Sequence, residues 1–170
     1  MPTIQFVDLA AQQLILGDQI SRRISTVLDH GSYIMGPEVA ELEELLAARI
    51  QRQHCVTCAS GTDALQMALM ALEVLPGDRV VVPDFTFVAT AEAVRLVGAE
   101  PVFADVDPIT YNLDPESAAL AWDLPGPSPV GIIAVDLFGH PAHGEQLERL
   151  ANRHSAWLIT DGAQSFGAMR

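Results

Sequence analysis

Short apolar runs alternate with amphipathic stretches along most of this 170-residue chain, and the alternation restricts the folds open to it. The clearest runs, at 80–82 and 130–135, consist of valine, isoleucine, alanine and a single glycine. Continuous runs of this kind are typical of strands buried on both faces, which occur in parallel sheets covered by helices. The sequence therefore predicts an α/β domain with a mostly parallel, doubly wound sheet flanked by helices.

The expected elements follow from the hydrophobic period and from the Pro, Gly and Asp residues that separate the runs. Strands are expected at 55–58, 79–82, 101–104, 130–135 and 156–160. Helices are expected at 18–28, 39–50, 62–75, 88–97 and 143–154, with a further helix capped by Asp114. In such sheets ligands bind at the carboxyl ends of the strands, so the expected binding loops are 59–62, 83–87, 136–140 and 161–164.

The formal net charge is −13, from 22 acidic and 9 basic residues, and the basic residues are scattered apart from the pair Arg22-Arg23. A surface of this sign repels phosphate backbones and anionic membranes, so neither nucleic acid nor a membrane is expected as a partner. The sequence has no apolar run long enough to cross a bilayer and no secretory leader at its start. A cytoplasmic location is therefore expected.

Cys55 and Cys58 have the Cys-X-X-Cys spacing, which occurs in redox pairs as well as in ordinary cores. Because both fall in a run expected to be a strand, reduced core thiols are the favoured interpretation, and a redox role stays open. The sequence shows no companion pair of ligands at a zinc-site spacing, so no metal is expected.

The segment Ser60-Gly61-Thr62 opens an expected helix directly after an expected strand. Free backbone N–H groups at a helix start, together with the helix dipole, favour an anion, and glycine lets a phosphate approach the backbone. Thr62 adds a hydroxyl group. The segment is either a phosphate-binding turn or only the cap of the helix, and both interpretations remain open.

Asp161 follows the last expected strand and opens the small-residue segment 161–167. A buried carboxylate there could pair with a protonated ring nitrogen, as pyridoxal phosphate requires, or could cap the next segment. Phe85 and Phe87 follow the strand expected at 79–82, where one ring could stack on a flat ligand or both could belong to the core. A phosphate site, a stacking face and an anion for a ring nitrogen together fit one such ligand.

Five stretches in order along the chain resemble the DegT/DnrJ/StrS family of sugar aminotransferases, which has the type I aminotransferase fold. They are HGSYIMGPEV at 30–39, SGTDAL at 60–65, PGD at 76–78, TFVAT at 86–90 and DGAQSFG at 161–167. Within the family, the segments 33–38 and 58–66 are most similar to enzymes that aminate a UDP-linked 2-acetamido-2-deoxy-3-keto-hexuronate. The resemblance implies the N-terminal part of such an enzyme, truncated before the last strands of its large domain and before the small C-terminal domain. Residues 1–50 would be a helical segment packing on the large domain, and residues 51–170 the incomplete cofactor-binding large domain.

The resemblance also implies a site, a cofactor and an activity. The cofactor would be pyridoxal phosphate, with its phosphate at Gly61 and Thr62, its ring stacked on Phe87, its ring nitrogen at Asp161 and its hydroxyl side near Gln164; Gly31 and Tyr33 would reach the nucleotide-sugar substrate. The enzyme would convert a keto group of a nucleotide-linked sugar to an amine, usually with glutamate as donor, for cell-surface polysaccharide or related amino-sugar biosynthesis. It would be a homodimer.

The sequence departs from the family in three places near the site and in one larger respect. Thr160 and Gly162 stand where the family usually has Glu and Ala, and Asp136 stands where it often has His, which leaves the role of that loop open. The Schiff-base lysine would lie beyond Arg170, and all nine basic residues of the chain are arginine. Because arginine stays protonated it cannot substitute for that lysine. We therefore expect no catalytic residue in this chain and no activity from it alone.

Two alternatives remain open at this stage. The chain could be a non-catalytic module that binds the cofactor or a sugar nucleotide, or that serves in assembly. It could also derive from a pyridoxamine-phosphate-dependent sugar dehydratase of the same family, in which histidine replaces the lysine. A nicotinamide-binding Rossmann domain fits poorly, because no Gly-X-Gly-X-X-Gly turn follows the first strand.

Overall fold

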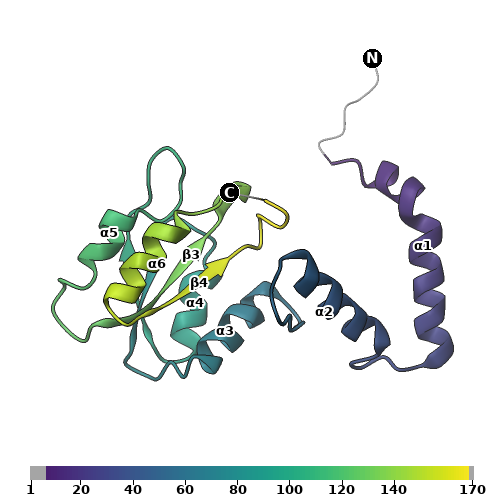
Figure 1. Cartoon of the computed structure of the whole chain (residues 1–170), viewed down its shortest axis with the longest axis horizontal. Coiled ribbons are helices and arrows are strands. Elements are labelled where there is room, and N and C mark those ends of the chain that lie inside the picture. The colour runs from purple at the N-terminus through teal and green to yellow at the C-terminus, as the bar shows by residue number, and fades with distance from the viewer. Residues whose placement is uncertain (1–6, 169–170) are drawn as a thin grey trace, which may run out of the picture. The chain divides into compact units, whose positions relative to one another are not determined.

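The computed structural model describes residues 7–168, whose elements are traced in Figure 1. The chain divides into two compact units, residues 1–57 and residues 58–170. The prediction that a segment of residues 1–50 packs on the large domain stays a prediction. Within the described part, no helix is both long enough and apolar enough to pass through a bilayer.

The first unit contains two helices, α1 (Leu9–His30) and α2 (Pro37–Arg49). The carboxylate of Asp8 caps α1 by accepting a hydrogen bond of 2.9 Å from the backbone N–H of Ala11. The helix ends at Gly31, whose left-handed φ of 69° directs its N–H to the carbonyl of Val27. Both expected helices are confirmed, although α1 begins at Leu9 rather than Asp18.

Charged and polar side chains link α1, α2 and the segment that follows them. Arg23 forms two hydrogen bonds to the carboxylate of Glu41, at 2.7 and 2.6 Å, and His30 Nε2 lies 3.1 Å from Glu38. Arg23 keeps 62% of its side chain exposed, so the pair fixes geometry more than it adds stability. Glu43 Oε1 accepts hydrogen bonds of 2.8 Å from both the N–H and the hydroxyl of Thr57.

The expected strand at 55–58 is wrong, and so is the interpretation of its cysteines as core thiols. The segment has no regular structure, because no strand of the described residues pairs with it. Cys55 is only partly buried and Cys58 is exposed, and both are free thiols. The Cys58 thiol donates a hydrogen bond of 3.2 Å to the carbonyl of Ser60, just before α3.

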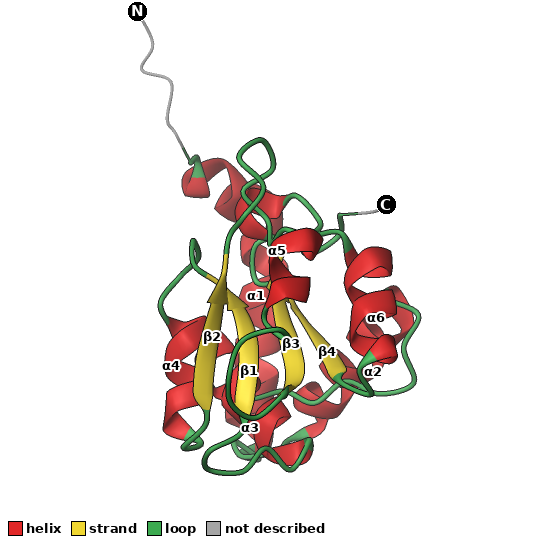
Figure 2. Cartoon of the chain, turned by 90° about the vertical axis from the view of Figure 1, so that its left-hand side faces the viewer, coloured by secondary structure: helices red, strands yellow, loops and turns green. Residues whose placement is uncertain are grey.

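The second unit is the predicted α/β domain. Its elements are α3 (Gly61–Ala71), β1 (Arg79–Pro83), α4 (Ala89–Leu96), β2 (Glu100–Ala104), α5 (Pro115–Leu120), β3 (Pro129–Val135), a 3-10 turn (Leu137–Gly139), α6 (Gly144–Arg153) and β4 (Trp157–Asp161). All strand pairs are parallel, in the order β2-β1-β3-β4 seen in Figure 2. Helix α3 stops at Ala71 rather than Leu75, because Glu73 has a left-handed φ of 56°.

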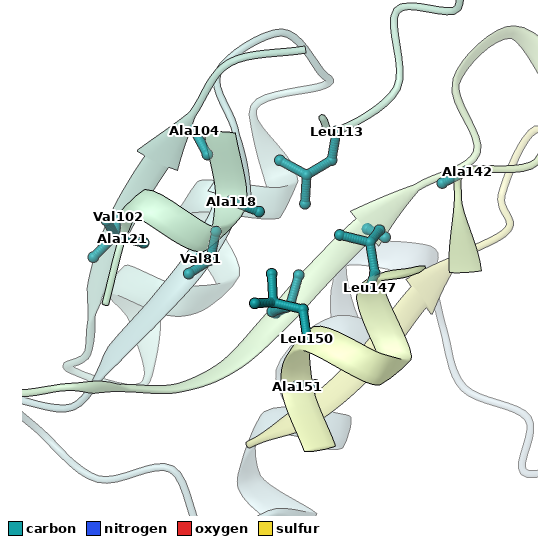
Figure 3. Packing of buried hydrophobic residues seen from close by; sticks show 12 residues of the cluster. Val81, Val102, Ala104, Leu113, Ala118, Ala121, Ala142, Leu147, Leu150 and Ala151 are labelled. Atoms are coloured by element: carbon teal, nitrogen blue, oxygen red, sulfur yellow. The ribbon is translucent and has the colours of Figure 1, made fainter. Parts of the chain in front are cut away.

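Helices cover both faces of this sheet, which confirms the doubly wound prediction. On one face Val80, Val82 and Ile133 pack with apolar residues of α3 and α4. On the other face Val81 and Ile132 pack with α5 and α6, through the residues drawn in Figure 3. Every residue of β1 is buried, whereas the edge strands β2 and β4 are partly exposed. The inner pair β1–β3 therefore lies at the centre of both hydrophobic clusters.

The winding of the chain reverses between β1 and β3. From β1 the chain runs through α4 to β2 on one side, and then returns through α5 to β3 on the other side of β1. In open parallel sheets such a reversal separates the two loops at the carboxyl edge and creates the usual ligand-binding crevice. The loops after β1 and β3 flank this point, and the loop after β4 lies next to that after β3.

Gly131 in β3 lies directly under the indole ring of Trp157 in the neighbouring strand. A Cβ atom at position 131 would lie 2.1 Å from the Trp157 ring, far inside van der Waals contact. The two residues are register partners, so the ring cannot move aside without leaving the strand pair. The one glycine of this apolar run is thus required by its neighbour.

We expect Gly131→Ala to destabilise the domain by about 3 kcal/mol, the upper part of the range for overpacking. The measurement is denaturant unfolding followed by tryptophan fluorescence. Gly61→Ala is the matched control, because a Cβ there meets nothing within 4 Å and should change stability by less than about 0.5 kcal/mol. Equal stability of Gly131→Ala and wild type would contradict the packing described here.

The link between Glu43 and Thr57 should depend on pH. Hydrogen bonds from the N–H and then the hydroxyl of Thr57 hold the pKa of Glu43 below its ordinary value of 4.5. A lowered pKa stabilises the folded form above pH 4.5, and this contribution is lost as the pH falls through the lower folded value. The Thr57 amide signal in an NMR titration should therefore shift at a pH below 4.5. Glu43→Gln should abolish that step, and its persistence in the variant would assign it to another group.

Candidate functional site

The amino end of α3 presents two free backbone donors. Ser60 caps the helix: its hydroxyl accepts from the N–H of Asp63 at 3.1 Å and donates to the Asp63 carboxylate at 2.7 Å. Among the described residues the N–H groups of Gly61 and Thr62 have no acceptor, and the space beside Gly61 is open. Because residues 72–78 connect α3 to the start of β1, this end of the helix faces the carboxyl edge of the sheet. An anion such as a phosphate fits these donors and the helix dipole.

Asp161 is the last residue of β4 and stands at the same edge. Its Oδ1 accepts a hydrogen bond of 3.0 Å from the N–H of Ala163, so it does cap the following turn. Within the described part of the chain its Oδ2 has no hydrogen-bond partner, and the residue is half-buried. Asp161 therefore keeps one oxygen for a donor outside the protein, such as a protonated ring nitrogen.

Gln164 is held by the loop that follows β3. Its Oε1 accepts a hydrogen bond of 2.7 Å from the N–H of Phe138. Because that partner is a donor, the orientation of the carboxamide is defined, and the two N–H bonds of Nε2 point elsewhere. The backbones also approach closely: a Cβ at Gly139, where φ is 83°, would lie 3.1 Å from the carbonyl of Gln164. Gln164 therefore offers hydrogen-bond donors at this edge.

The two phenylalanines after β1 have different surroundings. Phe87 is 69% exposed, which excludes the interpretation of this ring as a core residue. Phe85 belongs to an aromatic group instead: its ring lies 5.8 Å from that of Tyr111, and Tyr111 lies 6.0 Å from Phe138. Phe87 is thus the ring left free to cover a flat ligand.

Gly31 and Tyr33 belong to the first unit. Gly31 ends α1, and its carbonyl accepts a hydrogen bond of 3.1 Å from the N–H of Tyr33, whose side chain is 65% exposed. Their role in substrate binding stays a prediction. In the described residues no group of three or more His, Cys, Asp or Glu could hold a metal ion.

Two buried polar residues fix the loop after β3: Asn112, which sequence reasoning missed, and Asp136, whose loop it left without a role. Asn112, 1% exposed, accepts from the N–H of Leu137 at 3.1 Å and donates to the carbonyl of His140 at 2.8 Å. Asp136, 7% exposed, accepts from the N–H of Ala142 at 2.8 Å. The place of Asp136 directly after a buried strand was a usable signal, whereas nothing near Asn112 in the sequence points to partners so far along the chain.

The comparisons with known proteins agree with this geometry. The model of the DegT/DnrJ/EryC1/StrS aminotransferase family matches residues 15–170. The chain belongs to this family. The resemblance seen in its five motifs is thereby confirmed, together with the type I fold and the dependence of the family on pyridoxal phosphate.

Individual members of the family are similar over nearly the whole chain. A UDP-2-acetamido-2-deoxy-3-oxo-D-glucuronate aminotransferase of Pseudomonas aeruginosa is 49% identical over 165 residues, covering 97% of this chain and 45% of that protein. The crystal structure of a family aminotransferase from Brucella abortus superposes with a TM-score of 0.93 at 46% identity, covering 97% of this chain and 45% of the other. The structure of NtdA from Bacillus subtilis with bound cofactor PMP gives 0.85 at 28% identity, covering 99% and 39%. The chain thus spans less than half the length of these family members.

Replacing Asn112 by Asp should destabilise the domain by about 2 kcal/mol or more. The variant keeps an acceptor for Leu137 but loses the donor for the His140 carbonyl and places a charge in a buried site. Denaturant unfolding measures the change. Asn152→Asp, at an exposed position of α6, is the control and should cost less than about 1 kcal/mol. Equal effects of the two variants would show that the two hydrogen bonds of the Asn112 side chain are unimportant for stability.

Proposed function

We propose that this chain is the cofactor-binding part of a pyridoxal-phosphate-dependent aminotransferase that converts a keto group of a nucleotide-linked sugar to an amine. The observation that carries the proposal is the set of polar groups with spare hydrogen-bonding capacity at one edge of the sheet. Gly61 and Thr62 contribute donors there, and Asp161 contributes an acceptor. Family membership supports it independently.

Each group of this edge has a role that its surroundings support. The N–H groups of Gly61 and Thr62 would hold the cofactor phosphate, and the free oxygen of Asp161 would accept the proton of the ring nitrogen. Phe87 would cover one face of the ring and exclude water from it. The Nε2 of Gln164 would donate to the ring hydroxyl oxygen. When bound, the cofactor supplies an electron sink for the bonds broken next to the transferred nitrogen.

The Asp161 carboxylate keeps that sink effective, because its negative charge favours the protonated form of the ring nitrogen. No lysine is present to move protons at the sugar carbon, since the nine Lys and Arg residues of the chain are all arginine. We therefore propose that these 170 residues bind and orient the cofactor without turnover.

The family relatives support a proposal for the substrate class. The Pseudomonas aeruginosa relative is a UDP-2-acetamido-2-deoxy-3-oxo-D-glucuronate aminotransferase, and we propose the same class, a UDP-linked 3-keto sugar, with glutamate as the donor. Gly31 and Tyr33 would contact that substrate. The exposed apolar side chains of α1, such as Leu14 at 88%, support association of the complete protein as a homodimer. We propose a cytoplasmic location, where nucleotide sugars are made.

The test measures the binding of pyridoxal phosphate to the 170-residue chain by equilibrium dialysis, and then dialyses the complex against buffer without cofactor. We expect the cofactor to bind reversibly and to be removed completely by dialysis against buffer. Borohydride should not attach it covalently to a side chain, because no lysine is present. Asp161→Asn should weaken binding about tenfold, the effect of roughly 1.4 kcal/mol from loss of the anionic acceptor. Asp105→Asn, at the carboxyl side of the edge strand β2, is the control and should bind like wild type. Equal affinities of Asp161→Asn and wild type would refute the assignment.

A further inference from the structure

Asp136 is a buried carboxylate that no cation neutralises. It is 7% exposed, and no ion pair of the described residues includes it. Each of its oxygens instead has a neutral donor: Oδ1 accepts from the N–H of Ala142 at 2.8 Å, and Oδ2 accepts from the hydroxyl of Ser165 at 2.7 Å. A buried carboxylate has a desolvation cost, and these two hydrogen bonds satisfy both of its oxygens.

The two partners of Asp136 belong to different loops. Ala142 closes the loop after β3, and Ser165 lies in the loop after β4. A second bond joins the same two loops, from the N–H of Phe138 to Oε1 of Gln164, also at 2.7 Å. Because Gln164 and Ser165 are neighbours in the chain, the two bonds form one latch across the carboxyl edge of the sheet.

The loop after β3 has a strained conformation at the point where the latch meets it. Phe138 has a left-handed φ of 57°, which is rare for a bulky residue. Such a conformation persists only where its surroundings hold it, and it occurs often at functional sites. Here Asn112 fixes the N–H of the preceding Leu137, and Asp136 fixes Ala142. The result is that the Phe138 N–H points at Gln164.

We infer that Asp136 and Ser165 are positioning residues for Gln164. Through the latch they fix its carboxamide so that the N–H groups, rather than the carbonyl, face the ligand. The site therefore selects a planar ring that carries a hydrogen-bond acceptor, such as a phenolic oxygen, beside its reactive position. The inference rests on the proposed function for the role of Gln164, and it gives a role to the Asp136 loop.

The first experiment needs no ligand and measures amide hydrogen exchange by NMR. Ser165→Ala and Asp136→Ala should each raise the exchange rate of the Phe138 amide at least tenfold relative to that of Ile132 in β3. Asp136→Asn should stay near wild type, because its carbonyl can accept from Ala142 and its amide can donate to the Ser165 hydroxyl. Ser117→Ala, which removes a hydrogen bond to the N–H of Asp105, is the control and should leave Phe138 unchanged. Unchanged Phe138 exchange in Ser165→Ala would overturn the latch.

The second experiment compares the affinities of pyridoxal phosphate and of its 3-deoxy analogue, which lacks the phenolic oxygen. Wild type should prefer pyridoxal phosphate about tenfold, and Ser165→Ala and Gln164→Ala should both bring the ratio close to one. Asp136→Asn should keep the wild-type ratio. Equal weakening of both compounds in Ser165→Ala, with an unchanged ratio, would make the serine merely structural and overturn the inference.

The two experiments separate this inference from the proposed function. If wild type binds neither compound, the proposed cofactor binding fails and the selection by Gln164 fails with it. The exchange rates then still decide whether the latch exists.

Discussion

The burial of β1 and β3 on both faces is the constraint on which the rest of the second unit depends. Val80 and Val82 point to α3 and α4, and the intervening Val81 points to α5 and α6, so helices must lie on both sides. A chain that covers both faces with right-handed crossovers must reverse its winding within the sheet. Here the reversal falls between β1 and β3, and it opens the edge where the candidate site stands.

The charge of the molecule shapes how that site can bind an anion. With a net charge of −13 and no lysine, the chain has few side-chain cations to offer a phosphate. The free N–H groups at the start of α3 would provide an anion site without any cation. Asp161 and Gln164 each keep hydrogen-bonding capacity unused by the protein, one as acceptor and one as donor. A ligand with a phosphate, a protonated ring nitrogen and a phenolic oxygen would satisfy all of these groups together, as we propose.

In the function proposed for this chain, holding the cofactor and reacting on it fall to different residues. The residues proposed to hold the cofactor are fixed by short-range capping bonds and by the latch between the loops after β3 and β4. The Asp136 carboxylate joins the two loops, because it accepts from Ala142 in the loop after β3 and from Ser165 in the loop after β4. The 170 residues contain no lysine, so we propose that they orient a bound cofactor without using it.

Local sequence pattern determined the other strands, the helices, the cap at Asp114 and the fold class. Burial on two faces and helix capping both depend on residue types that lie within a few positions of one another. The same reasoning failed at Cys55–Cys58, since a short apolar run becomes a strand only if another strand pairs with it. The motifs located Gly61, Phe87, Asp161 and Gln164, but not the direction in which each group points. Only the tertiary structure decided that Oε1 of Gln164 meets the Phe138 N–H and that Asn112 holds the loop at Leu137. These contacts join residues 25 or more positions apart, and their geometry depends on the assembled sheet rather than on any local pattern.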